Sequence, residues 1–430
     1  MNPEQGWEAG SVRSIAVLRP NALGDFIFCL PALHALRQRY PAARLSYIGQ
    51  AWHADFLRGR PGPIDEVLVM PPYPGVGAPA TEGGSTRRSA PEGGAAAPGA
   101  AGLGVPEHVA PGSRRQANAG AAGAAAGATS IEASSANALQ GSIPAGGIGD
   151  PGPIDDFIAR IRARRFDLAL QLYGGGRHAN PLLRRFGARH CVGMQASDAE
   201  PLDRNLHFAD AVNKRLQLLE VAALAGAAAW PMHAPLQVTA QDRQQAARCV
   251  APAAGDKLVL LQPGSRDPRR CWPARDFARL GDALSGRGMQ ILINGSQQEG
   301  PLVQSVIAAM RHPACDLSGK TSLHALCGLL ERCALVVSND TGPLHLALEI
   351  GVPAVGVYWF TNLIESAPLR QAGHRAAVSL QIHCPVCGAE NIMQRCPHDA
   401  SFVAGVSLDE VLAHALALLG DQHPRSEARA

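Results

Sequence analysis

The sequence has no apolar run long enough to cross a membrane as a helix. Its first ten residues, MNPEQGWEAG, lack the basic start and apolar core of a signal peptide. Charge is nearly balanced, with 39 Lys and Arg against 36 Asp and Glu and a net charge of +3, so overall electrostatics does not indicate nucleic acid as a partner. We therefore expect a cytoplasmic protein that binds no nucleic acid, and no feature predicts a stable protein partner.

A long internal segment, residues 74–150, contains no Phe, Tyr, Trp, Cys, Met or Lys and consists mainly of Ala, Gly, Pro and Ser. Such a stretch cannot bury enough apolar surface to offset the entropy lost on ordering. We predict a disordered insertion, which a fold tolerates because the entropy of loop closure grows only logarithmically with length. The remaining chain suits two domains, 12–235 and 236–420.

Strand and helix patterns alternate outside this insertion, which predicts an α/β protein with parallel sheets and right-handed crossovers. Two such halves indicate two Rossmann-like domains, whose ligands would lie beyond the carboxyl ends of the strands. The sequence lacks a GxGxxG turn, so a nicotinamide or flavin site of the usual kind has little support. The expected strands are residues 14–18, 44–48, 66–70, 168–172, 190–192, 258–261, 290–293, 335–337, 354–357 and 376–379.

Residues 334–347, ALVVSNDTGPLHLA, combine a buried strand with an abrupt helix start. The cap residues around Asp340 and Thr341 lead into Gly342 and a proline, and an apolar helical pattern follows. Free N–H groups and the helix dipole favour an anion at such a place, usually a phosphate. A well-capped turn without ligand is equally consistent with this pattern, and His345 alone would more often be a structural, hydrogen-bonded histidine.

A second turn of this kind follows the first strand. Residues 19–25 are polar and contain a glycine, and residues 26–39 have the apolar spacing of a helix. Asp25 therefore lies at or near a helix start. It is either an ordinary acid that interacts favourably with the helix dipole or a carboxylate placed at the edge of a ligand site.

These turns and three further segments together resemble glycosyltransferase family nine, the heptosyltransferase family of lipopolysaccharide core assembly. The segments occur in the order of the family and span most of the chain apart from the insertion. They are residues 19–41 (RPNALGDFIFCLPALHALRQRYP), 166–177 (FDLALQLYGGGR), 260–280 (LLQPGSRDPRRCWPARDFARL), 291–299 (ILINGSQQE) and 338–358 (SNDTGPLHLALEIGVPAVGVY).

The resemblance implies a GT-B fold, in which the two Rossmann-like domains face each other across a cleft. It also implies inverting transfer of a heptose from ADP-heptose to a lipopolysaccharide core or related glycan. The acceptor would be a glycolipid or glycan at the inner membrane, where the protein could bind peripherally at the inner face. ADP-sugar is then the donor substrate, and no metal cofactor is needed.

The resemblance also implies roles for individual residues. Asp25 would be the general base that takes the proton of the acceptor hydroxyl. Glu299 matches a ribose-binding acid of the family. Since a carboxylate beside a diphosphate would repel it, we expect Asp340 instead to cap its turn or to hold a sugar hydroxyl. The expected donor-binding residues are Gly264, Ser265, Arg266, Arg270, Glu299, Asp340, Thr341, Gly342 and His345.

One of these positions departs from the family pattern. The family places a lysine two residues before Trp-Pro, where this chain has Arg270. Arginine keeps the positive charge but is bulkier and planar, so donor preference or rate can differ.

Several alternatives stay open at this point. They are a transferase of this fold that uses another nucleotide-sugar, a nucleotide-sugar epimerase, and a non-catalytic nucleotide-sugar or glycan-binding protein. The epimerase would need an acid–base pair that we cannot identify, and Asp25 speaks against the non-catalytic protein.

Two side-chain clusters stand apart from these motifs. Arginines at 160–165 and 184–185 indicate a solvated helix face or, alternatively, a site for anionic lipid headgroups. Ten cysteines in a protein without a signal peptide favour reduced thiols. Cys384, Cys387, Cys396 and His398 could form a structural zinc site, but their spacing is tighter than usual and a second CxxC is missing, so the sequence favours the absence of metal.

Overall fold

The computed structural model describes residues 7, 9–77, 153–228, 235–251, 255, 257–370, 372–392 and 394–420. Most of the predicted insertion lies outside these residues. Its first four residues, 74–77, belong to the fold: Val76 is fully buried, and the side chain of Gln50 donates to the carbonyl of Gly77 at 2.9 Å. The predicted start of the insertion at residue 74 is therefore too early.

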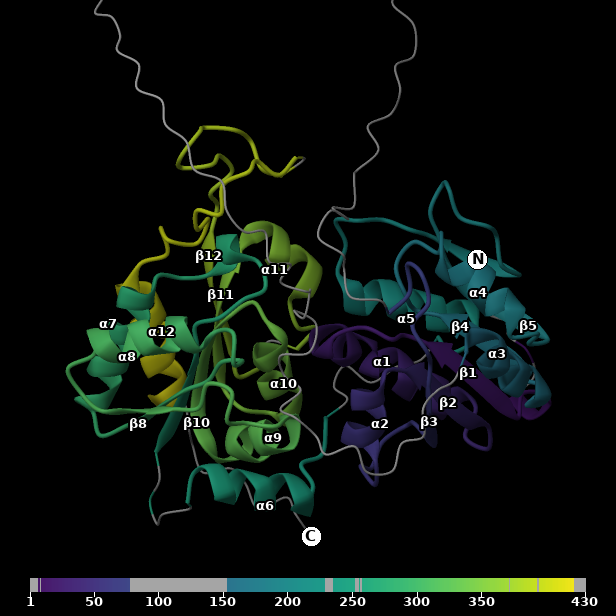
Figure 1. Ribbon diagram of the computed structural model, residues 1–430, viewed down its shortest axis with the longest axis horizontal. Helices are drawn as coiled ribbons and strands as arrows, with labels where there is room; N and C mark the ends of the chain where they lie inside the picture. Colours follow the sequence, from purple (N-terminus) through teal and green to yellow (C-terminus); the bar gives the residue numbers. More distant parts are fainter. Residues whose placement is uncertain are drawn as a thin grey trace, which may run out of the picture. The chain divides into compact units, whose positions relative to one another are not determined.

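The first domain contains a six-stranded parallel sheet in the order β3-β2-β1-β4-β5-β6 (Figure 1). Its strands are β1 (Ser14–Leu18), β2 (Arg44–Gly49), β3 (Glu66–Val69), β4 (Leu168–Gln171), β5 (His190–Gln195) and β6 (Arg204–His207). Its helices are α1 (Leu23–Arg39), α2 (Ala51–Leu57), α3 (Ile154–Ala163), α4 (Ala179–Arg185) and α5 (Lys214–Leu224).

The second domain repeats this arrangement with the order β12-β11-β10-β7-β8-β9, also entirely parallel. Its strands are β7 (Leu258–Gln262), β8 (Gln290–Ile293), β9 (Ala314–Asp316), β10 (Cys333–Asn339), β11 (Ala354–Trp359) and β12 (His374–Ser379). Its helices are α6 (Ala240–Cys249), α7 (Ala274–Ser285), α8 (Gly300–Ala309), α9 (Leu323–Arg332), α10 (Gly342–Ile350), α11 (Phe360–Ser366) and α12 (Leu408–Gly420).

Each sheet has the 3-2-1-4-5-6 order of a dinucleotide-binding fold, which confirms the two predicted Rossmann-like halves. The connections reverse direction between β1 and β4 in the first sheet and between β7 and β10 in the second. Loops diverge at such a switch point and leave room for a ligand beyond the strand ends. Asp25 follows β1 and Asp340 follows β10, so both lie at these points.

All ten expected strands are present, and most are one to four residues longer or shorter than predicted. The two missed strands, β6 and β9, are outer strands of four and three residues with little of the β-branched or aromatic character that marks strands in a sequence. The first helix begins at Leu23, three residues before its predicted start at Phe26, so Asp25 lies within its first turn.

One hydrophobic cluster extends from α1 and α5 of the first domain to α9 and α10 of the second. The contact between α1 and α10 can be followed in Figure 1. Separate clusters cover the opposite faces of the two sheets, beneath α3 and α4 in one domain and beneath α7, α8 and α12 in the other. The helix starts that carry the two sequence motifs are therefore held together by apolar packing.

Candidate active site

Asp25 lies on the first turn of α1 and is held in place by a buried arginine, Arg19. Arg19, at the end of β1, places its Nη2 atom 3.2 Å from Asp25 Oδ1 and donates from Nε to the Asp25 carbonyl at 2.9 Å. Its Nη1 atom donates to the Leu172 carbonyl beyond β4, which spans the switch point of the first sheet. The side chain of Asp25 is one-third exposed, against 5% for Arg19, and Oδ2 has no hydrogen bond to a described residue. One carboxylate oxygen is therefore held in place while the other is available to a ligand.

The glycines of the two motifs meet where α1 contacts α10. A Cβ atom built on Gly24 would lie 3.7 Å from Gly342 Cα and 3.8 Å from His345 Cδ2. A Cβ atom on Gly342 would be 3.3 Å from a methyl carbon of Leu23, closer than side chains normally pack. Glycine at both positions permits this approach, and it brings Asp25 beside the start of α10.

The start of α10 retains unsatisfied backbone donors. Thr341 is the N-cap residue, but its hydroxyl donates to the Asn339 carbonyl at 3.3 Å instead of accepting from the helix. Pro343 has no N–H group, which leaves Gly342 N–H as a donor at the helix start without a cap among the described side chains. The structure therefore retains the anion-binding potential predicted for this turn.

Asp340 is buried and held by three partners. Its Oδ1 atom lies 2.9 Å from His345 Nε2 and accepts from Ser366 Oγ at 2.8 Å, and its Oδ2 atom lies 3.6 Å from Arg270 Nη1. Burial tends to raise the pKa of Asp340, but the contacts with His345 and Arg270 outweigh burial and lower it. Asp340 therefore does not cap the helix, and Arg270 offsets the repulsion that its carboxylate would exert on a phosphate.

Burial also lowers the pKa of His345, so the imidazole is neutral at neutral pH. Since its Nε2 atom faces a carboxylate, we assign the proton to Nε2, which makes it the donor to Asp340. The ring packs edge-on against Phe28 of α1, with centroids 4.7 Å apart. His345 thus positions Asp340 and fills the junction between the helices, which is the hydrogen-bonded, structural role expected from the sequence as the more common one.

The loop after β7 is fastened to β10 through an asparagine that sequence reasoning missed. Asn339 Nδ2 donates to the Pro263 carbonyl at 2.7 Å, and Asn339 Oδ1 accepts from Trp272 N–H at 3.0 Å. The indole of Trp272 is fully buried and donates to the Val406 carbonyl at 2.9 Å. These contacts hold both ends of the loop that carries Arg270, whose Nε atom is buried without a hydrogen-bond partner among the described residues.

Glu299 and Gly264 lie together at the adjacent ends of β8 and β7. Glu299 accepts from Ser296 N–H at 2.7 Å, and a Cβ atom on Gly264 would overlap its carboxylate. Ser265 Oγ accepts from Asp267 N–H at 3.4 Å in the same loop. Arg266 is exposed and has no ion pair with the described residues, so the structure does not bring it to Asp340 or Arg270.

A buried arginine of α5, Arg215, joins the two domains near Asp340. This residue was not predicted from the sequence. Arg215 donates to the Ser366 carbonyl at 2.6 Å, lies over the ring of Phe28 at 4.6 Å, and places Nη2 3.7 Å from Glu349 Oε1. Burial raises the pKa of Glu349 to about 7. No sequence motif marks Arg215, because its partners are more than 100 residues away along the chain.

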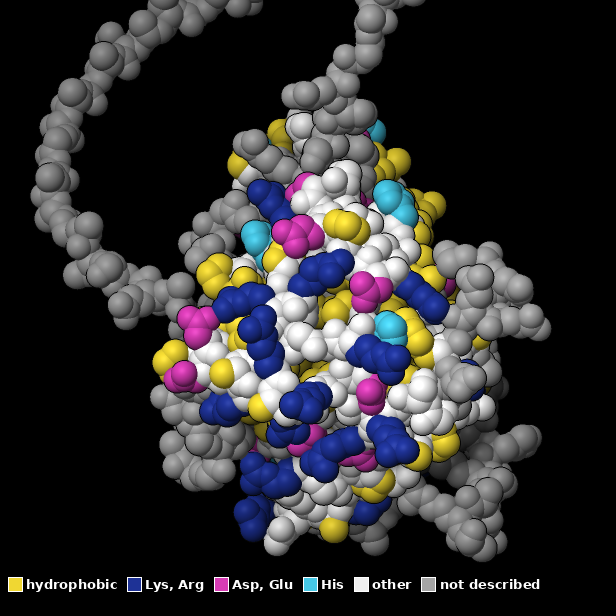
Figure 2. Space-filling model, turned by 90° about the vertical axis from the view of Figure 1, so that its right-hand side faces the viewer, with side chains coloured by type: hydrophobic (Ala, Val, Ile, Leu, Met, Phe, Trp, Pro, Cys, Tyr) yellow, Lys and Arg dark blue, Asp and Glu magenta, His cyan; other side chains and the backbone are white. Residues whose placement is uncertain are grey.

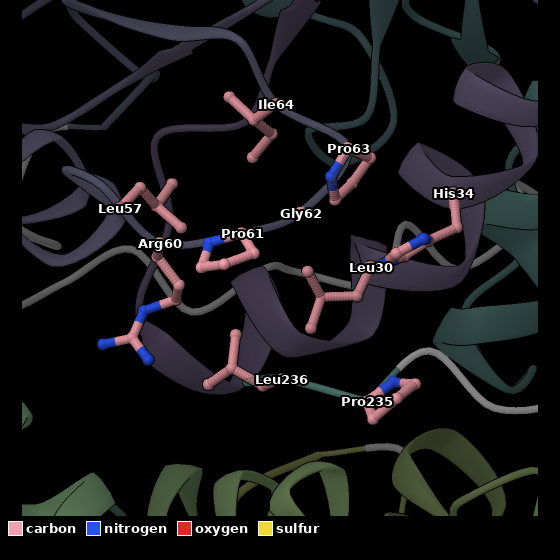
Figure 3. Close-up of a pocket in the computed structure, with 10 residues that line it drawn as sticks. All are labelled: Leu30, His34, Leu57, Arg60, Pro61, Gly62, Pro63, Ile64, Pro235 and Leu236. Atoms are coloured by element: carbon pink, nitrogen blue, oxygen red, sulfur yellow. The ribbon is translucent and has the colours of Figure 1, made fainter. Parts of the chain in front are cut away.

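A separate pocket lies between α1, the loop after α2 and the connection at Pro235 and Leu236 (Figure 3). Prolines and aliphatic side chains make up most of its wall. Its guanidinium group, that of Arg60, is bound to the carboxylate of Asp242. The pocket contains neither Asp25 nor Asp340, so it is not part of the candidate active site.

The structure brings together the cysteine cluster for which the sequence favoured the absence of metal. One ligand atom from each of Cys384, Cys387, Cys396 and His398 lies within 4.8 Å of the others. These residues come from the segment between β12 and α12, outside the site around Asp340.

Residues 154–393 match the sequence profile described as Glycosyltransferase family 9 (heptosyltransferase). The chain belongs to glycosyltransferase family 9. The match includes the loop of Arg270 and the turn of Asp340, while Asp25 lies before its start.

Curated relatives cover only part of the chain. Lipooligosaccharide heptosyltransferase 2 of Haemophilus influenzae is 30% identical over 117 residues, which are 26% of this chain and 34% of that protein. Lipopolysaccharide heptosyltransferase 2 of Escherichia coli K12 is 25% identical over 199 residues, which are 45% of this chain and 55% of that protein. The matched stretches thus span about one-third to one-half of these relatives.

The similarity to solved structures extends over nearly the whole chain. The ADP-heptose lipopolysaccharide heptosyltransferase II of E. coli superimposes with a TM-score of 0.62 and 15% identity, covering 95% of this chain and 98% of that one. At this identity the match shows the fold, which confirms the predicted GT-B architecture. No helix within the described ranges has the length and apolar character needed to cross a membrane.

Proposed function

We propose that this protein is an inverting glycosyltransferase that moves a heptose from ADP-heptose to a lipopolysaccharide core or related glycan. The observation that carries the proposal is the close approach of Gly24 and Gly342, which brings the first turn of α1, with the partly exposed Asp25, beside the start of α10. The proposed base, Asp25, and the proposed anion site at the start of α10 thereby lie next to each other at the junction of the domains. The E. coli structural relative is an ADP-heptose enzyme, which supports the choice of donor.

In the proposed reaction, the acceptor hydroxyl oxygen attacks the anomeric carbon of the donor and forms the new glycosidic bond. Its proton goes to Asp25, whose Oδ1 atom is oriented by Arg19. The bond from the anomeric carbon to the diphosphate breaks, and its electron pair leaves with ADP. Attack from the face opposite the leaving group inverts the anomeric carbon.

Arg270 and the backbone N–H of Gly342 would stabilise the charge that develops on the departing diphosphate. Ser265 lies in the loop after β7 and would add a hydroxyl donor, and Thr341 would add a second one if its hydroxyl turned away from the Asn339 carbonyl. Glu299, next to Gly264 at the end of β7, would hold the ribose hydroxyls. The proposed transfer step uses no metal, because these groups would stabilise the negative charge of the diphosphate.

The donor site is tested by calorimetry with ADP, UDP and GDP in the absence of added metal. We expect ADP to bind most tightly. Arg270→Ala should weaken ADP binding about 10- to 100-fold, because a hydrogen bond to a charged group contributes about 1.5–3 kcal/mol. Arg270→Lys, which restores the residue of the family pattern, should recover most of the affinity.

Arg287→Ala is the matched control, since Arg287 is an exposed arginine beyond α7 and should leave ADP binding unchanged. Tighter binding of UDP or GDP would keep the fold and replace the donor. Absence of binding to all three nucleotides would contradict the enzyme and favour a non-catalytic member of the family.

An acceptor embedded in a membrane requires the protein to reach an anionic surface. α3 and α4 lie on the side of the first domain that Figure 2 turns toward the viewer, where Lys and Arg side chains gather. Arg160, Arg162 and Arg184 are exposed on these helices. We propose that this basic face rests on anionic headgroups at the inner face of the inner membrane.

Replacement of Arg160, Arg162 and Arg184 by Ala should reduce partitioning onto vesicles of anionic phospholipid about 100-fold, at about 1 kcal/mol for each charge near the surface. Cosedimentation at low and high salt measures the effect. A charge-matched variant in which Arg275, Arg279 and Arg287 of the second domain are replaced should bind like the wild type, since these arginines are exposed on and just beyond α7. Equal losses in the two variants would show that net charge, rather than this face, governs binding.

A further inference from the structure

The segment between β12 and α12 has no helix or strand among its described residues. It runs from residue 380 to residue 407 and can be followed at the yellow end of the chain in Figure 1. Loops of this length without secondary structure are uncommon in a compact domain and are usually functional or disordered. This loop contains three of the ten cysteines of the chain and two histidines, of which His398 lies two residues after the third cysteine.

The first two cysteines are arranged by a tight turn. Gly388 N–H donates to the Cys384 carbonyl at 2.9 Å, and Cys384 N–H donates to the Ala389 carbonyl at 2.8 Å. Gly388 has φ of 73°, a conformation that glycine adopts without steric cost and that ends the turn directly after Cys387. Val386 N–H points at Cys384 Sγ at 3.4 Å and would stabilise a thiolate there.

The second half of the loop brings the other two groups to the same point. Cys384 Sγ lies 3.8 Å from His398 Nδ1, and the four ligand atoms lie within 4.8 Å of one another. Around a tetrahedral zinc ion, bond lengths of about 2.3 Å to sulfur and 2.0–2.1 Å to nitrogen give ligand–ligand distances of about 3.6–3.8 Å. The observed cluster therefore needs only small movements to close on an ion.

The composition of the cluster distinguishes a metal site from a disulfide. A disulfide would join two of the sulfur atoms, and the third thiol and the imidazole would take no part in it. Three sulfur atoms and one imidazole complete a tetrahedron and leave no open position for substrate, which is the pattern of a structural rather than a catalytic zinc site. Cys384 and Cys396 are buried and Cys387 is exposed, so an ion would be shielded on one side by the fold.

We propose that Cys384, Cys387, Cys396 and His398 bind one Zn²⁺ ion, which orders this loop and holds it against the loop that carries Arg270. The loops are joined by Phe402 N–H, which donates to the Arg269 carbonyl at 2.8 Å, and by Ser401 Oγ, which donates to the Cys271 carbonyl at 2.7 Å. These two carbonyls belong to the residues on either side of Arg270.

A third connection reaches the ion site itself. Asn391 Oδ1 accepts from Cys396 N–H at 3.2 Å and from Arg269 Nη1 at 3.4 Å. A displacement of Cys396 would thus be transmitted to Arg269 and to the backbone of its neighbour. Zinc binding itself is independent of the enzyme's activity, whereas its effect on the donor rests on the proposed function.

The first test is the metal content of purified, untagged, full-length protein kept reduced. We expect one zinc per chain, and Co²⁺ in its place should give thiolate charge-transfer bands and the intense visible bands of a tetrahedral ion. Cys387→Ser should weaken zinc binding more than about 100-fold, since loss of even a ligand's hydrogen-bond partner weakens it about 10- to 100-fold. Cys315→Ser, at an exposed cysteine outside the cluster, should change nothing.

Absence of zinc after dialysis against Zn²⁺, or full zinc binding by Cys387→Ser, would overturn the proposal. One iron per chain in place of zinc would overturn its assignment to zinc. The Co²⁺ spectrum is taken on the wild-type chain, so it tests thiolate ligation and tetrahedral geometry even if a cysteine variant fails to fold.

The effect on the Arg270 loop is tested by removing the ion with a chelator. We expect a lower Tm and at least tenfold weaker ADP binding, both reversed when Zn²⁺ is restored. Unchanged ADP binding by the chelated protein would overturn the positioning role and leave the zinc site. If the zinc-loaded protein binds no ADP, the proposed function fails and the zinc site stands.

Discussion

Asp25→Asn is expected to lower kcat for heptose transfer about 10²- to 10⁴-fold, the range that a positioned general base contributes. Asparagine retains an oxygen that can accept from Arg19, so the first turn of α1 should keep its geometry. It cannot take the acceptor proton, and the developing positive charge on the attacking oxygen is then left without a base. Steady-state kinetics with ADP-heptose and a purified core glycolipid measures the loss.

The loss should lie in kcat and not in donor binding, because the role proposed for Asp25 is to take the proton of the acceptor. Calorimetry with ADP and the Tm should therefore be close to wild type. Asp210→Asn is the matched control, since Asp210 is an exposed carboxylate of the same domain. A kcat within threefold of wild type for Asp25→Asn would show that another group takes the proton.

The placement of Asp25 was predictable because it depends on local sequence. A strand that ends in a polar, glycine-containing turn before a helix sends its next residues to the carboxyl edge of the sheet. This pattern located Asp25 after β1 and Asp340 after β10 from the sequence alone. The regular alternation of strands and helices likewise predicted the two parallel sheets, since periodicity is a local property.

Contacts between distant segments were not predictable in this way. Arg19 and Asn339 span the switch points of their sheets, and Arg215 joins α5 to Ser366, but the sequence gives only the residue types and not their partners. Asp340 illustrates the consequence: its place in the sequence favoured capping or a contact with a sugar hydroxyl, whereas His345, Ser366 and Arg270 surround it.

The cysteine cluster is a second arrangement that the sequence did not predict. Its spacing argued against a metal because the segments between the cysteines are short and only one CxxC is present. The turn at Gly388 and the fold of the following residues nevertheless bring His398 to Cys384. Spacing in the sequence therefore did not predict that these four side chains lie together.

Besides Arg215 and Glu349, a second buried ion pair links the two domains. Arg60, beyond α2, forms a paired hydrogen bond with Asp242 of α6, at 2.8 Å and 2.9 Å. His324 of α9 contributes a third contact, with Nδ1 2.6 Å from Asp242 Oδ1. The side chains of Arg60 and Asp242 are 1% and 0% exposed, so water cannot replace either partner.

Asp242→Ala is therefore expected to lower the free energy of unfolding by about 3–5 kcal/mol, because it leaves the Arg60 guanidinium buried and uncompensated. Urea denaturation at pH 7 measures the change, and Glu331→Ala is the control. Glu331 pairs with Arg243, which is exposed, so its loss should be below about 1 kcal/mol. Equal losses in the two variants would show that burial does not set the strength of the Asp242 contacts.

The pH dependence provides an independent check on the same residue. Burial alone would raise the pKa of Asp242, but the hydrogen bonds with His324 and Arg60 lower it to about 2 from an ordinary 3.8. A carboxyl group that binds its proton less readily in the folded chain stabilises the fold above its unfolded pKa, and this contribution is lost as pH falls through its folded pKa. The wild type should therefore lose stability between about pH 4 and pH 2 more steeply than Asp242→Ala. Parallel curves for the two proteins would contradict a charged Asp242 at the junction of the domains.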